Sequence, residues 1–254
     1  MKKYILSVLL GGAFMFTACS DFLDEEPKGD ITSEGYYKTA QHAISATNAI
    51  YDYLIIGYAP NGLWDKNYGG TFYNDYWVLQ DMFADNSETN QTSIDYQSVE
   101  NMQIDQYNQP VELLWRDFYQ TIKCCNVVID KVPSIDMDVT LRNQLVAEAK
   151  FFRAMMYFDL IRMFGDVPLR EHNVESAAED VTSRTSKETI YELIFSDLKT
   201  AETDLKYAER FGGGRPYPAS ASALLARVYV TYAAEHQLSL IHISEPTRHS
   251  LISY

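Results

Sequence analysis

The segment between Leu141 and Met163 constrains the fold more than any other part of this 254-residue chain. Apolar residues recur there every three or four positions, which is the spacing of a helix face, and a second face of the same helix is apolar too. The two faces hold Leu141, Leu145, Ala149, Phe152, Met156, Leu160 and Met163, and Phe151, Met155 and Phe158. A helix that is apolar on two sides must be covered on two sides, as in stacked helical arrays. Gly165 and Pro168 predict its end.

Four further segments have helical periodicity, and strand-like alternation is absent from the same part of the chain. They are residues 33–56, 110–132, 185–205 and 219–234. Ser33 is the candidate N-cap of the first helix, and Thr185 with Glu188 has the spacing of a capping box for the third. Residues 57–109 lack a sustained period and are predicted to form long loops with short helical pieces. The sequence therefore predicts an all-α fold.

A faint internal repeat suggests how these helices are arranged. Residues 149–158 (AKFFRAMMYF) and 221–230 (ASALLARVYV) share two alanines and a tyrosine at equivalent places, 72 residues apart. That separation is about two tetratricopeptide lengths of roughly 34 residues each. The repeat favours helix pairs stacked as a solenoid.

The charge balance excludes one class of partner. The chain has 21 Lys and Arg against 35 Asp and Glu, a formal net charge of −14, and loss of Lys2 and Lys3 with residues 1–18 would leave −16. Such a surface repels phosphate backbones, so we expect no nucleic-acid partner. The acidity favours solubility or calcium binding and names no ligand by itself.

The N-terminus has the pattern of a lipoprotein signal peptide over residues 1–18. Lys2 and Lys3 precede an apolar run of 13 residues, and Thr17 and Ala18 are small residues directly before Cys19. The sequence FTAC resembles a lipobox, which predicts that Cys19 becomes the lipid-attachment residue and tethers the protein to a membrane. The alternative is an ordinary secretory signal. Residues 19–32 are acidic and turn-prone, and we expect them to form an extended tether.

The last residues differ from the rest of the chain. Helical periodicity stops near residue 237, and LSLIHISEPTR at 238–248 resembles the translation of a transposase-type sequencing adapter. We interpret residues 238–254 as an artefactual tail. On this interpretation the native protein continues beyond an incomplete helical domain that spans residues 33–237.

Five segments together resemble the SusD/RagB family of nutrient-binding outer-membrane lipoproteins. In chain order they are ACSDFLDEEP, WRDFYQTIKCCNVVIDKVP at 115–133, EAKFFRAMMYFDLIRMFGDVPL at 148–169, YELIFSDLKTAETDL at 191–205 and GRPYPASASALLARVYV at 214–230. The resemblance implies tetratricopeptide-like helix pairs in a SusD-like α-solenoid, with long loops that carry a shallow glycan site. It also implies a SusC-like TonB-dependent transporter as partner, and a surface-exposed position at the outer membrane. A missing C-terminal half would supply much of the substrate-binding region.

Residues 58–77 are the candidate glycan-binding surface. This stretch has seven aromatic residues in twenty, against 13% in the whole chain. Aromatic faces stack on the apolar faces of sugar rings, and planar polar side chains bind hydroxyls. The candidate residues are Trp64, Asp65, Asn67, Tyr68, Tyr73, Asn74, Tyr76 and Trp77. The alternative is that Trp77 begins a core helix and the tyrosines pack against it or against the transporter.

Enzyme and metal sites have little support in the sequence. Paired acids such as Asp136 and Asp138 fit helix caps, residues 212–214 lack the lysine of a phosphate loop, and no Ser-His-Asp set can be assembled. Cys124 and Cys125 are adjacent on a predicted helix and fit small core residues. An acidic loop at residues 81–88 could attract calcium but lacks EF-hand spacing. We therefore expect no enzyme activity, cofactor or metal.

The interpretation is a cell-surface lipoprotein that captures an oligosaccharide or polysaccharide and delivers it to a SusC-like transporter. Capture of peptides, as implied by relatives of the RagB type, is the main alternative. A surface glycosidase is a more remote one.

Overall fold

The computed structural model describes residues 36–58, 64–72, 75–84, 86–90, 92–174, 183–206 and 214–236. Its described helices and strands all belong to one compact unit, residues 37–254. They are α3 (Ala40–Ile55), β1 (Ile56–Tyr58), β2 (Trp64–Gly69), α4 (Asp75–Asp81), α5 (Ile94–Glu100), α6 (Gln109–Lys131), the short 3₁₀ helix η2 (Val132–Ser134), α7 (Val139–Phe164), α8 (Lys187–Asp204) and α9 (Pro218–Glu235). The signal peptide, tether and tail predicted from the sequence lie outside the described residues.

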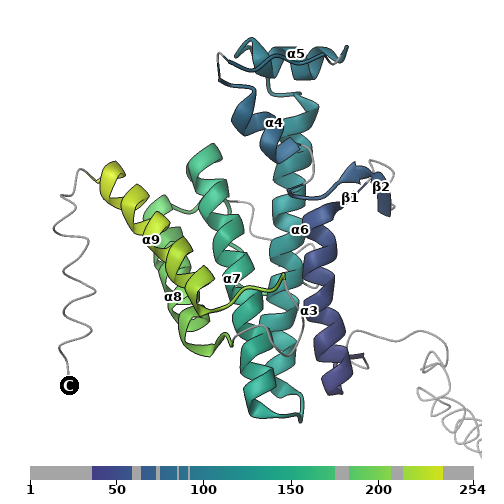
Figure 1. Cartoon of the computed structure of the whole chain (residues 1–254), viewed down its shortest axis with the longest axis vertical. Coiled ribbons are helices and arrows are strands. Elements are labelled where there is room, and N and C mark those ends of the chain that lie inside the picture. Colours follow the sequence, from purple (N-terminus) through teal and green to yellow (C-terminus); the bar gives the residue numbers. More distant parts are fainter. Residues whose placement is uncertain are drawn as a thin grey trace, which may run out of the picture. The chain divides into compact units, whose positions relative to one another are not determined.

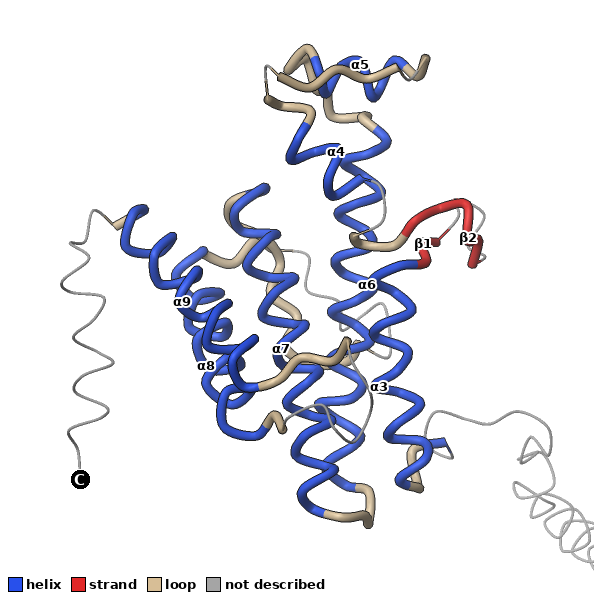
Figure 2. Tube along the Cα trace, in the orientation of Figure 1, coloured by secondary structure: helices blue, strands red, loops and turns tan. Residues whose placement is uncertain are grey.

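The five long helices form an antiparallel array (Figure 1). In the order α3, α6, α7, α8, α9, each helix runs opposite to the one before it and packs against it. Helix α7 contacts α3, α6, α8 and α9. The predicted all-helical fold of stacked helix pairs is confirmed, and the helix that the sequence marks as apolar on two sides lies inside the array (Figure 2).

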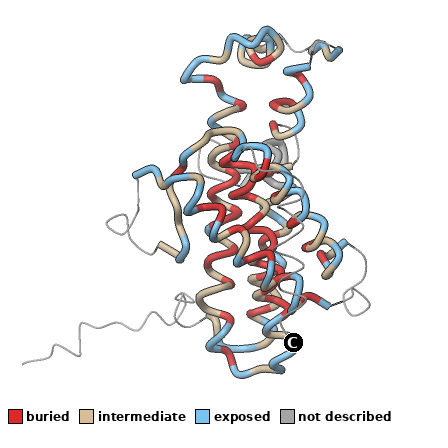
Figure 3. The backbone as a smooth tube through the Cα atoms, turned by 90° about the vertical axis from the view of Figure 1, so that its left-hand side faces the viewer, coloured by how far each residue is buried: buried red, intermediate tan, exposed pale blue. Residues whose placement is uncertain are grey.

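Burial follows this arrangement. Helix α7 buries residues around most of its circumference, and Met156, Tyr157, Phe158 and Leu160 are among those removed from solvent. Full burial of a side chain of this size contributes about 1.5–3 kcal/mol, so α7 supplies much of the folding free energy. Buried residues gather where the long helices face one another, whereas the end that holds α4 and α5 is mostly exposed (Figure 3).

Side-chain caps begin the helices α6, α7 and α8. The Asn108 side chain accepts a hydrogen bond from the Val111 N–H at the start of α6, and Asp138 accepts one from Leu141 at the start of α7. Helix α7 ends at Gly165, whose φ of 72° is one that other residues rarely adopt. The predicted end of this helix is confirmed.

The starts of α8 and α3 can be compared with the caps predicted at Thr185 and Ser33. Helix α8 is capped by Ser186, which accepts from the Thr189 N–H, and the Thr185 backbone instead forms a bridge with Val167. The predicted cap at Thr185 is therefore wrong by one residue, because a β-bridge holds Thr185 in the preceding segment. Helix α3 begins at Ala40, where Thr39 accepts from the His42 N–H at 3.3 Å, and Ser33 lies outside the described residues.

Residues 57–109 contain more regular structure than the sequence indicated. The short helices α4 and α5 were expected, but the antiparallel pair of β1 and β2 was not. Strand β1 is three residues long, which is too short to display alternation in the sequence. Across the described residues, every helix is too short or too polar to cross a membrane.

Candidate functional site

The short helices α4 and α5 enclose a pocket of about 530 Å³ at one end of α6. Its lining includes Trp77, Asp81, Ser87, Glu88, Asn90 and Tyr96. This volume falls within the usual range for small-molecule sites, about 300–1,000 Å³. The pocket therefore joins two aromatic rings to several hydrogen-bonding groups.

The phase of α4 gives the pocket its main aromatic wall. Val78 and Leu79 point into the core and are 2% and 7% exposed, whereas Trp77 is 47% exposed. Because neighbouring residues on a helix point about 100° apart, burial of those two side chains turns Trp77 outward. An indole left half-exposed beside polar groups provides a flat stacking surface.

Hydrogen bonds hold the second wall in place. The Tyr96 hydroxyl on α5 donates to the buried Asp75 carboxylate at the start of α4, at 2.9 Å. Asn108, which caps α6, also donates to the Asp95 carbonyl at 3.0 Å and to the Ser98 hydroxyl at 2.9 Å. These contacts join α5 to both α4 and α6 and hold the Tyr96 ring at the pocket.

A buried carboxyl group on α6, that of Asp117, interacts electrostatically with Asp75 at the start of α4. The pKa of Asp117 is raised to about 7, mainly by burial, with the Arg116 guanidinium lowering it and the Asp75 carboxylate adding a smaller upward effect. Asp117 is thus partly protonated near neutral pH. Asp117 does not line the pocket.

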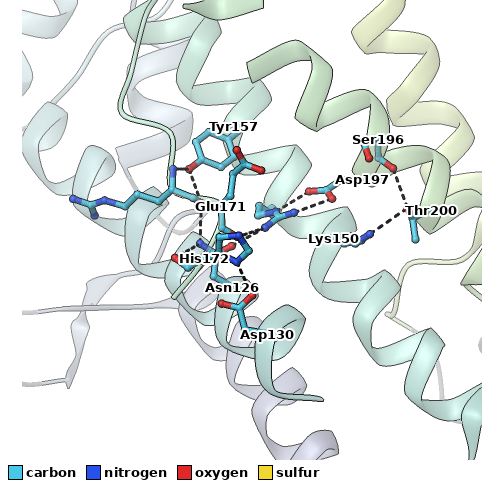
Figure 4. Close-up of polar contacts among 11 residues, drawn as sticks. Asn126, Asp130, Lys150, Tyr157, Glu171, His172, Ser196, Asp197 and Thr200 are labelled. Carbon is cyan, nitrogen blue, oxygen red and sulfur yellow. Dashed lines mark hydrogen bonds and ion pairs between the residues drawn. The ribbon is translucent and has the colours of Figure 1, made fainter. Parts of the chain in front are cut away.

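A second polar centre lies between α6, α7 and α8 and has a structural role. Buried Arg153 makes two charge-assisted hydrogen bonds to Asp197, at 2.7 and 2.9 Å, and also donates to the Asn126 side chain and the Glu171 carbonyl. Asn126 donates in turn to the Arg170 and His172 carbonyls. Figure 4 shows these groups converging from the three helices and the segment after α7.

This network holds residues 166–174 against the array. Tyr157 donates to the Arg170 carbonyl and accepts from the Arg170 N–H, while Asp130 accepts from the Asn173 N–H at 2.7 Å. Arg153 makes four hydrogen bonds within the protein and is 4% exposed, so this centre has little access to solvent.

A third centre fixes the start of α9. Arg215 donates to the fully buried Glu148 carboxylate on α7 at 2.7 Å and to the Asn48 side chain on α3. Its guanidinium also lies 5.0 Å above the centre of the Tyr51 ring, and Tyr51 donates to the same carboxylate at 2.7 Å. Of these three centres, the pocket by α4 is the one lined by several exposed side chains, and it is the candidate binding site.

The family model described as "SusD-like_3: Starch-binding associating with outer membrane" matches residues 21–230. The match covers most of the chain and includes α4, α5 and the pocket between them. The chain belongs to this SusD-like family. Carbohydrate binding and an association with the outer membrane are the properties that describe the family.

Curated SusD-like relatives agree with this assignment. SusD-like protein P2 of Formosa agariphila is 32% identical over 234 residues, which cover 91% of this chain and 43% of the relative. A SusD-like protein of Bacteroides ovatus is 26% identical, covering 91% of this chain and 39% of the relative. The chain thus spans about two fifths of the length of the curated relatives it matches.

Solved SusD-like structures share the fold. A laminarin-binding SusD-like protein superposes with a TM-score of 0.62 at 26% identity, covering 79% of this chain and 42% of that one. A SusD superfamily protein from Parabacteroides distasonis gives a TM-score of 0.59 at 31% identity, covering 76% and 40% respectively.

The structure places only part of the glycan-binding set predicted for this SusD-like chain. Trp77 lines the pocket, but Tyr76 turns the other way: it packs edge-on against Phe72 and Phe118 and donates to Asp159 at 3.0 Å. Tyr76 therefore connects α4 to Phe118 on α6 and Asp159 on α7. The side chains of Trp64, Asp65, Asn67 and Tyr68 on β2, like all of Tyr73 and Asn74, lie outside the described part.

Two features of the site went unpredicted. Tyr96 belongs to a seven-residue helix too short to show a clear phase, and Ser87, Glu88 and Asn90 reach the pocket only because α5 folds back beside α4. The acidic stretch considered for calcium supplies Asp81 and Glu88 to this pocket. Within the described residues, His, Cys, Asp and Glu do not gather in threes as a metal site would require.

Proposed function

We propose that this SusD-like protein captures an oligosaccharide or polysaccharide in the pocket between α4 and α5. The observation that supports this most is the half-exposed Trp77 ring, which forms one wall of a 530 Å³ pocket that also holds hydrogen-bonding side chains from Asp81, Ser87, Glu88, Thr89 and Asn90. The carbohydrate-binding description of the family gives the ligand class.

The chemistry of the pocket suits a sugar. The Trp77 and Tyr96 rings offer faces for the C–H groups of a pyranose, and Asp81, Glu88 and Asn90 offer acceptors and donors for its hydroxyls. Because the groups are few and the pocket is open to solvent at its acidic residues, we expect modest affinity for a single site. The role needs no covalent chemistry.

Delivery and anchoring complete the proposal. Lipidation at Cys19 would hold the protein at the outer membrane, on the cell surface, and a SusC-like TonB-dependent transporter would receive the glycan. The FTAC sequence at residues 16–19 supports the anchor, and the resemblance to the SusD/RagB family supports the transporter. A transporter that closes over the bound glycan would raise the effective affinity.

The test is affinity electrophoresis of the full-length protein in gels that contain starch, laminarin and other polysaccharides. Trp77→Ala should weaken the affinity obtained from the retardation about tenfold, since stacking of an aromatic ring contributes on the order of 1 kcal/mol or more. Phe83→Ala is the matched control, because Phe83 is exposed near the pocket without lining it. Trp64→Ala tests β2 separately.

The outcomes distinguish the alternatives. Loss of retardation in Trp77→Ala alone supports capture at this pocket, whereas equal loss in Phe83→Ala contradicts it. Retardation that depends on Trp64 and not on Trp77 would instead place the binding site at the antiparallel pair of β1 and β2. If no polysaccharide retards the protein, capture of peptides becomes the better hypothesis.

A further inference from the structure

The sequence around the pocket has an unusual charge distribution. Residues 67–115 contain no lysine, arginine or histidine, yet they contain eight acidic residues. These are Asp75, Asp81, Asp85, Glu88, Asp95, Glu100, Asp105 and Glu112. Helices α4 and α5 and the segment that joins them lie entirely within this range. Helices α4 and α5 and the segment between them therefore contain no cationic residue.

The described lining of the pocket also contains acidic side chains and no basic ones. The acidic ones are Asp81 and Glu88, and both are exposed. Arg116, the next cation along the chain, lies on α6 outside the described pocket lining and lowers the pKa of Asp117. A sulfate or uronate group placed beside the Trp77 ring would thus meet the Asp81 and Glu88 carboxylates, and no cation stands among the described lining residues to compensate for them.

We propose, on the basis of the function proposed above, that this pocket selects uncharged glycans and rejects sulfated or uronate-rich ones. Recognition of an anionic sugar normally uses arginine or lysine, whose donors pair with sulfate or carboxylate oxygens. A neutral sugar needs only a stacking surface and acceptors for its hydroxyls. Trp77, Asp81 and Glu88 supply both of these. Like charges brought together at a binding site act against the wrong ligand, which makes the carboxylates a specificity element.

Laminarin and laminarin sulfate are the probes, because they share one backbone and differ in charge. Affinity electrophoresis of the full-length protein should show at least about tenfold weaker binding of the sulfated form at roughly 50 mM NaCl. The difference should shrink at about 500 mM NaCl, where screening shortens the reach of the carboxylates to a few Å. If laminarin itself does not bind, the same comparison is made with a neutral polysaccharide that does and with its sulfated derivative.

Substitutions locate the effect. The double variant Asp81→Asn/Glu88→Gln should reduce the ratio of neutral to sulfated affinity several-fold. The variant Asp136→Asn/Glu192→Gln removes the same charge from exposed positions on other parts of the molecule and should leave that ratio unchanged. A ratio that responds equally to both pairs would show that net charge, and not the pocket, sets the preference, and would overturn the proposal.

Failure of this inference differs from failure of the proposed function. Preferential binding of laminarin sulfate, alginate or another polyanion that is lost in Trp77→Ala would overturn the preference for neutral glycans while supporting capture at the pocket. Binding of a neutral glycan that Trp77→Ala leaves intact would overturn the inference too, because the ligand would then lie elsewhere. Absence of binding to every neutral and anionic glycan would overturn both proposals.

Discussion

Arg153 is the residue on which the packing of α6, α7 and α8 depends most. It is 4% exposed, and its guanidinium donates to Asp197 of α8, Asn126 of α6 and the Glu171 carbonyl. Burial raises the pKa of Asp197, while the adjacent Arg153 opposes that rise. Removal of the cation would leave a buried carboxyl group and an unsatisfied carbonyl at the centre of the array.

Arg153→Ala is therefore expected to lower the free energy of unfolding by about 3–5 kcal/mol, the cost of breaking one side of a buried ion pair. Arg153→Lys should recover only part of this, because an ammonium group cannot reproduce the planar pair of bonds to Asp197. Urea denaturation measures both variants, with the exposed Arg184→Ala as control. A loss below about 1 kcal/mol for Arg153→Ala would contradict this role.

Asp117 gives the protein a pH dependence whose sign follows from its environment. Burial raises its pKa from 3.8 to about 7 in the folded protein, so the folded state holds a proton that the unfolded state has already lost. Folding stability from this group is therefore highest below pH 4 and falls as the pH rises towards 7, above which the penalty is constant.

Asp117→Asn should remove that slope. The difference in unfolding free energy between the variant and the native protein should increase by roughly 2–4 kcal/mol from pH 4 to pH 8, about 1.4 kcal/mol for each unit of pKa shift. Glu112→Gln, an exposed position on the same helix, is the control. A pH-independent difference would show that Asp117 is ionised in the folded protein throughout this range.

Some of the residues that matter here could be predicted from the sequence, and others could not. The density of aromatics identified the region of Trp77, but Tyr76 and Trp77 are adjacent, and only the phase of a seven-residue helix decides which one is exposed. Arg153 left a weaker signal. It stands beside Phe152 in a helix that is apolar on two sides, where a charged residue requires a partner, yet nothing in the sequence shows that the partner is Asp197, 44 residues away.

At the scale of elements, Arg215 connects the start of α9 to helices distant in sequence. It reaches Glu148 on α7 and Asn48 on α3, while Pro218 begins α9 three residues later. Among the described residues before α9, Arg215 thus connects this segment to α3 and α7.

Arg215→Ala should release this segment. We expect faster amide hydrogen exchange in residues 214–221 and a loss of roughly 2–4 kcal/mol in stability, because Glu148 would stay buried without its cation. Lys199→Ala, at an exposed position on α8, serves as control. Unchanged exchange at the start of α9 would show that α8 packing alone holds it.

Long helices were predictable from the sequence because burial imposes a period that survives over many residues. The hairpin of β1 and β2 was not, since its strands are three and six residues long. The cap of α8 was misplaced by one residue because Thr185 and Ser186 are chemically equivalent caps. A bridge to Val167, 18 residues earlier, decides between them. Contacts between distant segments thus settle what local patterns leave open.

At the scale of the whole molecule, lipid attachment at Cys19 would distinguish a membrane-anchored lipoprotein from a protein with an ordinary secretory signal. Cys19→Ser should abolish incorporation of radiolabelled palmitate and move the protein out of the membrane fraction, because lipid attachment needs the thiol. Cys124→Ser provides the control, since Cys124 is a partly buried cysteine on α6. Equal labelling of the native protein and Cys19→Ser would support an ordinary secretory signal instead.

The central claim, that glycan is captured between α4 and α5, is tested most directly by hydrogen exchange of the full-length protein with and without a bound neutral oligosaccharide, such as one from laminarin. The account predicts slower exchange in residues 77–96 and no change in α8 and α9, which lie apart from the pocket. Protection confined to other segments, with residues 77–96 unaffected at saturating ligand, would contradict it.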